Sequence, residues 1–440
     1  MKNSDLPVAN EPLVHAPRPN EEVTAFAGTL SVEAKGRKIE GEGRLFFRWL
    51  PSPCLRFEIA QPGAFSDIDL TEATLEAPAA GIAALPAGVL SISQKANPAD
   101  TSVAGVILDE FSLRGDGTEM TTVAFDVPNF HRIAHGSRRS TSRLTLEAGD
   151  WLVDIDATAD VDQRLQALCS VGGFVVTHAG LLRRTSGESF SFADTSTVRS
   201  ALSTWLSFSR GLWCSPIFWH SKPYGWTHYS CPRLSRWRAV QSWFPLLYCD
   251  RVPSTFPRMV EILADPIWKD PFELAIYWYV HANECAGGVE GSLVLIQTAF
   301  EMLAWTYLVK EKRILTKGTW QRLKGAVARI EQLLTKMGIP TDLPVKECPE
   351  LRAWAKSAGH DRSGPDALVG IRNAFVHSDT KNLKKALAVP TAAKREAWQL
   401  ALLYLESIIL TLLDYDGSIY SRIRSGYPSE VKVERPWLPV

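Results

Sequence analysis

The sequence predicts an α+β protein of several domains, in which a β-rich sandwich or barrel-like domain comes first and an all-α bundle follows. Three observations predict it. Apolar and polar residues alternate up to about residue 185, helical spacing begins near residue 270, and 440 residues exceed one ordinary core. We therefore expect a flexible N-terminus at 1–22, a β-rich domain at 23–190, a mixed Trp-rich connecting segment at 191–260 and a helical domain at 261–440.

The β-rich region consists of short alternating segments separated by Gly, Pro and Asp. These segments are TLSVEAKG, GEGRLFFRW, LRFEIA, DIDLTEATLE, VAGVILDEFSL, TTVAFDV, SRLTLEAG, WLVDIDA and FVVTHAG. Alternation of this kind is typical of half-buried antiparallel strands. Residues 161–170 break the pattern and predict one short helix before the last of these strands.

The connecting segment contains no Asp or Glu between residues 195 and 249. Its aromatic and basic residues are Trp205, Trp213, Trp219, Trp226, Trp237 and Trp243 together with Arg199, Arg210, Lys222, Arg233, Arg236 and Arg238. Interleaved cations and aromatic rings suit a surface that stacks bases and neutralises phosphates. Tryptophan also fills seams between domains, and packing is the interpretation we favour for this segment, with a helix over 199–208 and strands after it.

The C-terminal region predicts helices over 273–284, 292–312, 320–338, 349–359, 366–378 and 394–415, because apolar residues recur there every three or four positions. Gly338 and Pro340 end one helix, and the sequence Gly364-Pro365-Asp366 begins another. Pro suits a first helical turn, and Asp complements the helix dipole. We therefore expect the C-terminal helices to pack together as a bundle.

The helix that begins at Gly364 carries the run IRNAFVH, which contains Arg372, Asn373 and His377. On a straight helix Asn373 and His377 lie about 40° apart, so the amide can orient the imidazole. Arg372 and His377 diverge by about 140° around the helix and are separated by about 7.5 Å along its axis. The two side chains of one chain therefore cannot easily bind the same phosphate. Two copies facing each other would complete the site, which predicts an isologous dimer.

This Arg-Asn-x-x-x-His pattern on a late bundle helix resembles the signature of the HEPN superfamily. The resemblance implies a metal-independent endoribonuclease with a composite dimeric site and no cofactor. Residues 295–305, LIQTAFEMLAW, are similar to the earlier HEPN helix that carries an acidic residue, here Glu301. Residues 174–184, 203–213 and 421–437 resemble ApeA-type antiphage proteins, in which a β-rich domain precedes a HEPN domain. The acid-free insert at 214–234 departs from that pattern.

The resemblance also implies the role of each residue. His377 would move a proton, Arg372 would stabilise the charge on phosphorus, and Asn373 would hold the imidazole or the phosphate. Glu301 would not contact the substrate but would hold Arg372 or His377 in position through a hydrogen bond. Lys381, Lys384 and Lys385 could add phosphate contacts, although a solvated helix end explains them as well. The expected partners are RNA, a second copy of the chain and a phage-derived trigger.

Composition excludes several other classes of protein. Lys plus Arg equal Asp plus Glu at 48 each, so nucleic acid would need a local basic surface. Seven cysteines without a CxxC pair indicate reduced thiols in a cytoplasmic protein and no zinc site. We expect no membrane span, because polar residues such as Gln297, Glu301 and Glu406 interrupt the apolar runs.

No P-loop, GxSxG or dinucleotide motif occurs in the sequence. His281 with Glu284, and His360 with Asp361, are weaker site candidates. The alternative function is a non-catalytic RNA- or protein-binding module that uses its helical bundle for dimerisation.

Overall fold

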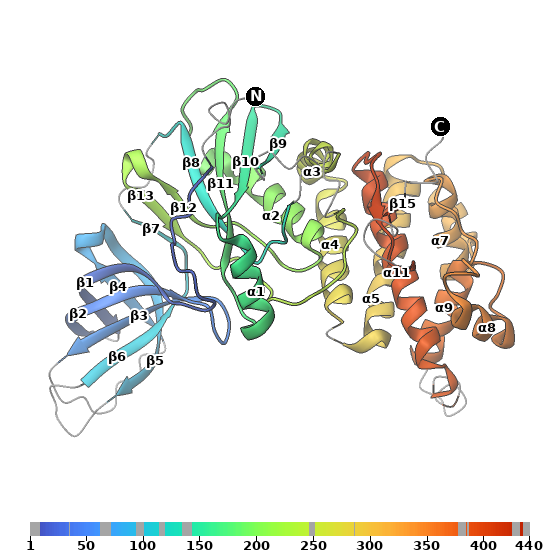
Figure 1. Cartoon of the computed structure of the whole chain (residues 1–440), viewed down its shortest axis with the longest axis horizontal. Helices are drawn as coiled ribbons and strands as arrows, with labels where there is room; N and C mark the ends of the chain where they lie inside the picture. Colours follow the sequence, from blue (N-terminus) through green and yellow to red (C-terminus); the bar gives the residue numbers. More distant parts are fainter. Residues whose placement is uncertain are drawn as a thin grey trace.

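The computed structural model of the protein describes residues 9–34, 36–61, 72–93, 101–113, 119–133, 143–245, 251–285, 287–376, 384, 387–424 and 432–433. Figure 1 shows a small β-barrel at the left, a twisted sheet in the middle and a block of helices at the right. The β-rich N-terminal region and the helical C-terminal region are therefore confirmed.

The barrel consists of six strands in the closed order β1-β2-β3-β6-β5-β4. They are β1 (Val23–Ala34), β2 (Arg37–Arg48), β3 (Cys54–Gln61), β4 (Ala73–Ala77), β5 (Ile82–Ser93) and β6 (Thr101–Ile107). Its core contains Leu30, Leu45, Phe57 and Ile59. A Cβ at Gly105 would lie 2.5 Å from Phe57, so only glycine fits where this ring fills the barrel.

A second sheet of seven strands has the order β7-β13-β12-β8-β11-β10-β9. Its strands are β7 (Phe111–Leu113), β8 (Thr122–Pro128), β9 (Arg143–Ala148), β10 (Trp151–Ala157), β11 (Val176–Arg184), β12 (Ile217–Ser221) and β13 (Trp226–Tyr229). Helices α1 (Val161–Val171) and α2 (Ser196–Arg210) belong to the same region. Strands β12 and β13 come from the predicted connecting segment, so this segment completes a sheet begun by the preceding residues.

The two faces of the seven-stranded sheet pack against different neighbours. Strand β12 contributes to both sides, since Ile217 and Phe218 join the core of the barrel while Trp219 joins the core shared with the helices. The sheet is thus the middle layer of the molecule (Figure 1).

Residues 10–20 are held by the sheet. The backbone N–H groups of Leu13 and Val14 donate to the Asp126 carboxylate at 2.9 and 3.1 Å, and that of Asn10 donates to Asp156 at 2.7 Å. The Asn20 side chain accepts from the backbone of Phe174. These hydrogen bonds join part of the segment 1–22, for which flexibility was predicted, to the sheet.

Asp126 predicts a measurable pH dependence of stability. Burial raises its pKa from 3.8 to about 7, against the opposing effect of the Leu13 and Val14 N–H groups. Between about pH 4 and 7 the folded protein then binds more protons at this site than the unfolded chain, so the contribution of Asp126 to stability falls as pH rises. The slope is at most about 1.4 kcal/mol per pH unit.

Urea unfolding of the wild type and Asp126→Asn at pH 4.5, 5.5 and 6.5 measures this slope. We expect the variant to lose this part of the pH dependence. Equal slopes in the two proteins would show that Asp126 is ionised throughout this range.

Most tryptophans of the acid-free segment are packing residues. Trp205 and Trp243 are fully buried, Trp219 and Trp226 are 3% exposed, and Trp213 and Trp237 are half-buried. The packing interpretation is confirmed for the four buried rings. Each ring joins the core that the sheet shares with the helices.

The C-terminal region is helical, as predicted. Its helices are α3 (Thr255–Ala264), α4 (Lys269–Glu284), α5 (Gly288–Trp305), α6 (Lys317–Arg322), α7 (Gly325–Lys336), α8 (Pro349–Ala358), α9 (Gly364–Val376) and α11 (Thr391–Leu412). A π-helical turn, Thr306–Glu311, extends α5, and strands β14 (Ile419–Tyr420) and β15 (Lys432–Val433) pair near the C-terminus. The predicted helix 320–338 divides into α6 and α7 because Gly325 has φ = 86°.

The segment Gly288–Glu311 is long and apolar enough to cross a membrane by length and composition alone. Within the bundle, however, 56% of its most apolar window is buried. Burial of this extent is typical of a core helix, and α5 packs against α4, α7, α9 and α11.

Candidate functional site

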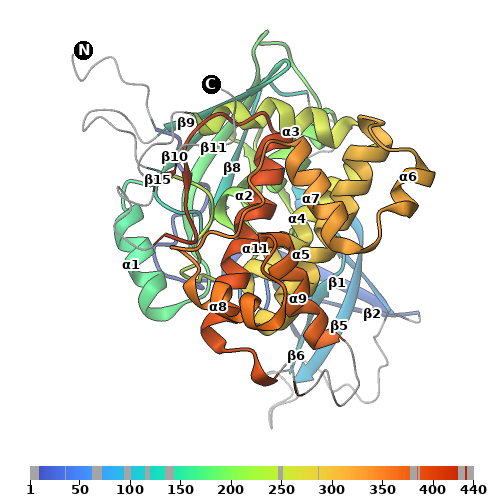
Figure 2. The same cartoon turned by 90° about the vertical axis from the view of Figure 1, so that its right-hand side faces the viewer.

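Helix α9 carries the predicted site and is the inner element of the bundle. It contacts α5, α7, α8 and α11, and Figure 2 shows it among these helices. Ala367, Leu368, Ile371 and Ala374 form the buried stripe that the helical period predicts. Neighbouring helices therefore determine the orientation of α9.

The start of α9 is a capping arrangement. Ser363 Oγ accepts the backbone N–H of Asp366 at 3.1 Å, and the Asp366 carboxylate accepts from Arg362 Nη2 at 2.8 Å. Burial is the largest single influence and acts to raise the pKa of Asp366, but the hydrogen bonds and charge of Arg362 together with the hydrogen bond from His360 outweigh it and hold the pKa below its ordinary value. Ser363 also donates to Glu331 at 2.6 Å, which ties the cap to α7. The polar residues before the helix thus fix its first turn.

Arg372 and Asn373 lie near the other end of α9, and both are half-buried. Arg372 Nη1 donates to Asn373 Oδ1 at 3.2 Å. The buried Nε of Arg372 has no hydrogen-bond partner among the described residues. Arg372 also forms no ion pair within the described part of the chain.

His377 lies outside the described residues, as do Lys381 and Lys385. The backbone of α9 is described through Val376, which immediately precedes the histidine. Lys384 is described and exposed. Asn373 was expected to orient His377, and the structure gives its amide oxygen a second possible role as the acceptor for Arg372.

Glu301 on α5 faces a different partner from the one expected. Its carboxylate accepts from Gln297 Nε2 at 3.0 Å and from Arg329 Nη1 at 3.2 Å. Arg329 belongs to α7, and its guanidinium carbon lies 4.7 Å from the centre of the Trp320 ring. The structure therefore joins Glu301 to α7 and not to Arg372.

Lys394 at the start of α11 is a residue of this region that sequence reasoning missed. Its amine lies 5.0 Å from the centre of the Phe375 ring and 2.8 Å from Glu290 on α5. The hydrogen bond from Lys394 lowers the pKa of Glu290. A cation is thus placed beside the motif by a helix distant in sequence, and no local pattern signals it.

His360 lies against α9 because position 370 is glycine. A Cβ at Gly370 would lie 2.5 Å from the His360 ring. The Nδ1 atom of His360 is 3.5 Å from Asp366 Oδ1, and the ring stacks on Trp354 with centroids 6.0 Å apart. The sequence named His360 and Asp361 as loop residues that could approach the motif, and the structure places His360 beside Asp366 at the start of α9.

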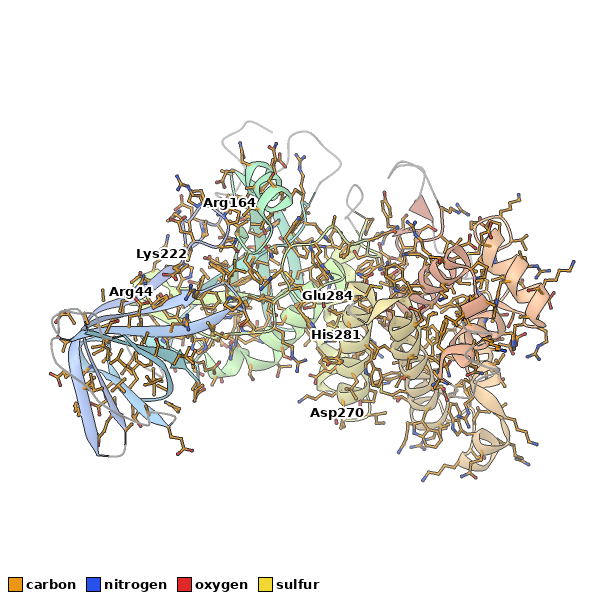
Figure 3. The ribbon with its side chains drawn as sticks, turned by 90° about the horizontal axis from the view of Figure 1, so that it is seen from below. Arg44, Arg164, Lys222, Asp270, His281 and Glu284 are labelled. Atoms are coloured by element: carbon orange, nitrogen blue, oxygen red, sulfur yellow. The ribbon has the colours of Figure 1, made fainter. Side chains whose placement is uncertain are left out.

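The second sequence candidate, His281 with Glu284, is a loose pair on α4. Their closest polar atoms are 3.9 Å apart, and Figure 3 shows both side chains on this helix. His281 packs on Tyr277 with centroids 4.3 Å apart. Among the described residues no group of three His, Cys, Asp or Glu side chains gathers to hold a metal ion.

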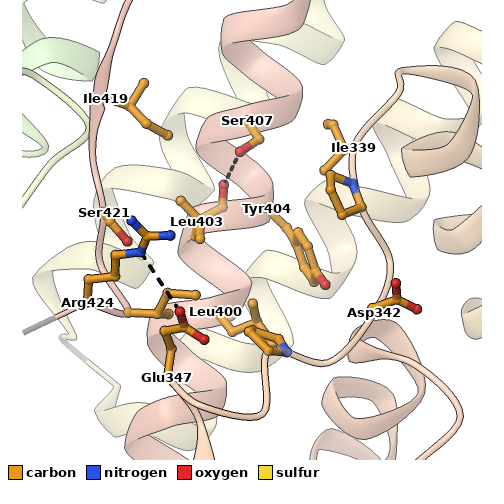
Figure 4. Close-up of a pocket in the computed structure, with 13 residues that line it drawn as sticks. Ile339, Asp342, Glu347, Leu400, Leu403, Tyr404, Ser407, Ile419, Ser421 and Arg424 are labelled. Carbon is orange, nitrogen blue, oxygen red and sulfur yellow. Dashed lines mark hydrogen bonds and ion pairs between the residues drawn. The ribbon is translucent and has the colours of Figure 1, made fainter. Parts of the chain in front are cut away.

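A cavity of about 200 Å³ lies beside α11 (Figure 4). Its walls are largely apolar, and the Arg424–Glu347 pair, 3.9 Å apart, lies at one side. Tyr404 lines it with a buried hydroxyl that has no partner among the described residues. That hydroxyl points towards Gly364, where a Cβ would be only 2.3 Å away, so the wall of the cavity contacts the first turn of α9.

Comparison with known proteins relates this chain to YopA. A model of the YopA central domain matches residues 115–240, and a model of the YopA C-terminal domain matches residues 265–434. The chain is 25% identical over 430 residues to the SPbeta prophage-derived uncharacterized protein YopA of Bacillus subtilis (strain 168), covering 95% of each chain. No solved structure matches the chain. The chain is thus similar to YopA over nearly its whole length.

Proposed function

We propose that the protein is a HEPN-like, metal-independent endoribonuclease of the cytoplasm that acts as a homodimer. Arg372 binds the scissile phosphate, His377 transfers the proton, and Asn373 positions one or both of these groups. In this proposal the barrel and the central sheet sense a phage component and restrain the bundle, so that RNA cleavage serves antiphage defence.

The observation that carries the proposal is the state of Arg372. It is a half-buried cation whose only hydrogen bond within the described chain goes to a neutral amide. A structural arginine in such a place would ordinarily be paired with a carboxylate. A guanidinium kept unpaired by a packed helix suits recognition of phosphate oxygens.

The reaction follows from these groups. The ribose 2′-oxygen attacks the adjacent phosphorus and gives its proton to a neutral imidazole, while the 5′-oxygen leaves with a proton from an imidazolium. The products are a 2′,3′-cyclic phosphate and a free 5′-hydroxyl. Arg372 stabilises the additional negative charge that develops on the phosphoryl oxygens. Because the nucleophile is the 2′-hydroxyl, DNA is not a substrate.

The defence context has one further support. The B. subtilis relative is described as prophage-derived, which associates it with a phage genome. A ribonuclease released by infection would suit that setting, together with the ApeA-like order of a β-rich region before a helical bundle.

Incubating the purified protein with total RNA in EDTA tests the proposal. We expect cleavage by the wild type and a loss of about 100-fold or more in Arg372→Ala, the usual consequence of removing a group that stabilises developing charge. Arg322→Ala is the matched control, since Arg322 is an exposed arginine of the same bundle on α6. Light scattering of the same samples gives the oligomeric state.

Cleavage that requires a divalent metal, attacks an all-deoxy oligonucleotide or survives Arg372→Ala would refute this mechanism. RNA that is bound but left intact by the wild type would instead identify a non-catalytic RNA-binding module.

A further inference from the structure

A second cavity, of about 380 Å³, lies where the central sheet meets the helical bundle. Its walls come from four places in the chain: the residues after β8, the end of α2, the connector 237–244 and strand β14. The lining residues that matter to the argument are His131, Arg210, Trp237, Gln241, Phe244 and Tyr420. Most of them belong to the acid-free segment.

Arg210 is a buried cation for which the described part of the chain provides no counter-charge. It is 4% exposed, its Nε donates to the carbonyl of Asn129 at 3.0 Å, and its Nη2 donates to that of Arg238 at 2.7 Å. No carboxylate of the described residues lies within ion-pair distance or lines the cavity. Burial lowers the pKa of Arg210 to about 10, so the group stays charged at neutral pH. A buried charge without an ionic partner is costly, which favours an anion as the missing partner.

His131 adds a second unsatisfied polar group. Its ring packs between Phe130 and Phe244, with centroid distances of 4.4 and 4.3 Å. The Nε2 atom is buried and has no hydrogen-bond partner in the described structure. Burial lowers the pKa of His131, as do the charges of Arg210 and His178, so the imidazole is neutral and one nitrogen can donate to a bound oxygen.

Aromatic rings form the rest of the wall. The Arg210 guanidinium carbon lies 4.6 Å from the centre of the Trp237 ring, a distance at which the ring attracts the cation. Phe244 and Tyr420 line the same space. A cation beside flat apolar rings, in a volume of this size, suits a small organic anion that also carries a planar ring.

We propose that this cavity binds an organic phosphate of nucleotide size, with its phosphate on Arg210 and His131 and its ring among Trp237, Phe244 and Tyr420. The site is separate from the motif on α9.

The cavity is also connected to the bundle. Gln241 donates through Nε2 to the carbonyl of Ser421 at 3.0 Å, and its own carbonyl accepts from Arg422 at 2.8 Å. Arg422 is paired with Glu406 on α11, and α11 packs against α9. A ligand that orders the connector can therefore act on the proposed ribonuclease. This regulatory role rests on the proposed function, whereas the binding of an organic phosphate in the cavity does not.

Isothermal titration of the full-length protein with AMP, inorganic phosphate and adenosine tests the site. We expect AMP to bind, adenosine to bind at least about 30-fold more weakly, and inorganic phosphate to compete with AMP, because one charge-assisted hydrogen bond is worth about 10- to 100-fold in affinity. Arg210→Met should weaken the affinity for AMP by at least about 30-fold. Arg233 is an exposed arginine of the same segment, and Arg233→Met should leave the affinity for AMP unchanged.

His131→Phe keeps a planar ring at this position and removes the unpartnered Nε2, so the site can still be tested if Arg210→Met fails to fold. We expect it to weaken AMP by about 5-fold or more. Absence of AMP binding at millimolar concentration, adenosine affinity equal to that of AMP, or unchanged affinity in a folded Arg210→Met or His131→Phe would overturn the proposal. Binding without any RNA cleavage would support the site while refuting the ribonuclease.

Discussion

Arg422→Met is expected to destabilise the protein by about 3–5 kcal/mol, the usual consequence of leaving a buried charge without its partner. Glu406 is fully buried, and the Arg422 side chain is 1% exposed. The two form a bidentate pair at 2.7 and 2.8 Å. Tyr279 donates to the same carboxylate at 2.6 Å, as does the backbone of Trp243 at 3.0 Å. These two neutral donors alone cannot replace the lost positive charge.

Urea denaturation followed by circular dichroism measures this loss. The double variant Arg422→Met, Glu406→Leu should recover much of it, since both charges are then absent. Lys38→Met breaks the exposed Lys38–Glu76 pair in the barrel and is the control, for which we expect no measurable change. If Arg422→Met unfolded at the same urea concentration as Lys38→Met, the pair would contribute little.

Trp205→Ala is expected to cost a similar amount, about 3–5 kcal/mol, because it leaves a large cavity in the core. Trp205 is fully buried and lies among Phe130, Phe244 and Phe256. Its Nε1 donates to Thr255 Oγ1 at 2.8 Å and so links α2 to α3. Removing the ring would also leave that hydroxyl one partner short.

Trp213→Ala in the same segment is the matched control, since Trp213 is half-buried and a smaller loss is expected. The same unfolding measurement compares the two variants. A Trp205→Ala protein with wild-type stability and weakened RNA binding would reverse our interpretation and make this ring a base-stacking surface.

The strands and helices that the sequence predicted are those with a strong local pattern. The alternation in β8, β10 and β11 and the helical stripe of α9 each appear as expected. Strand β5 was missed because its sequence, IAALPAGVLSIS, is rich in Ala, Gly and Pro and poor in the β-branched and aromatic residues that signal a strand. The position of residues 10–14 depends on Asp126, more than 100 residues away, and no local pattern reveals such a bond.

In the candidate site, too, the sequence predicted local features but not contacts between distant segments. Arg372 and Asn373 were found because their spacing on one helix is a local property. The contact of Glu301 with Arg329 was not predicted, because the sequence does not say that α7 lies beside α5. Lys394 and Arg210 were not singled out for the same reason, since each acquires its surroundings only when distant segments pack together.

The boundary between cores has a practical consequence for how the molecule can be divided. One continuous core runs from Met120, just before β8, to Ile419 in β14. A second core fills the barrel and also takes in Val176, Ile217 and Phe218 from the seven-stranded sheet. A cut on either side of the sheet would therefore expose apolar side chains on both fragments, so the barrel, the sheet and the helices must be inherited together.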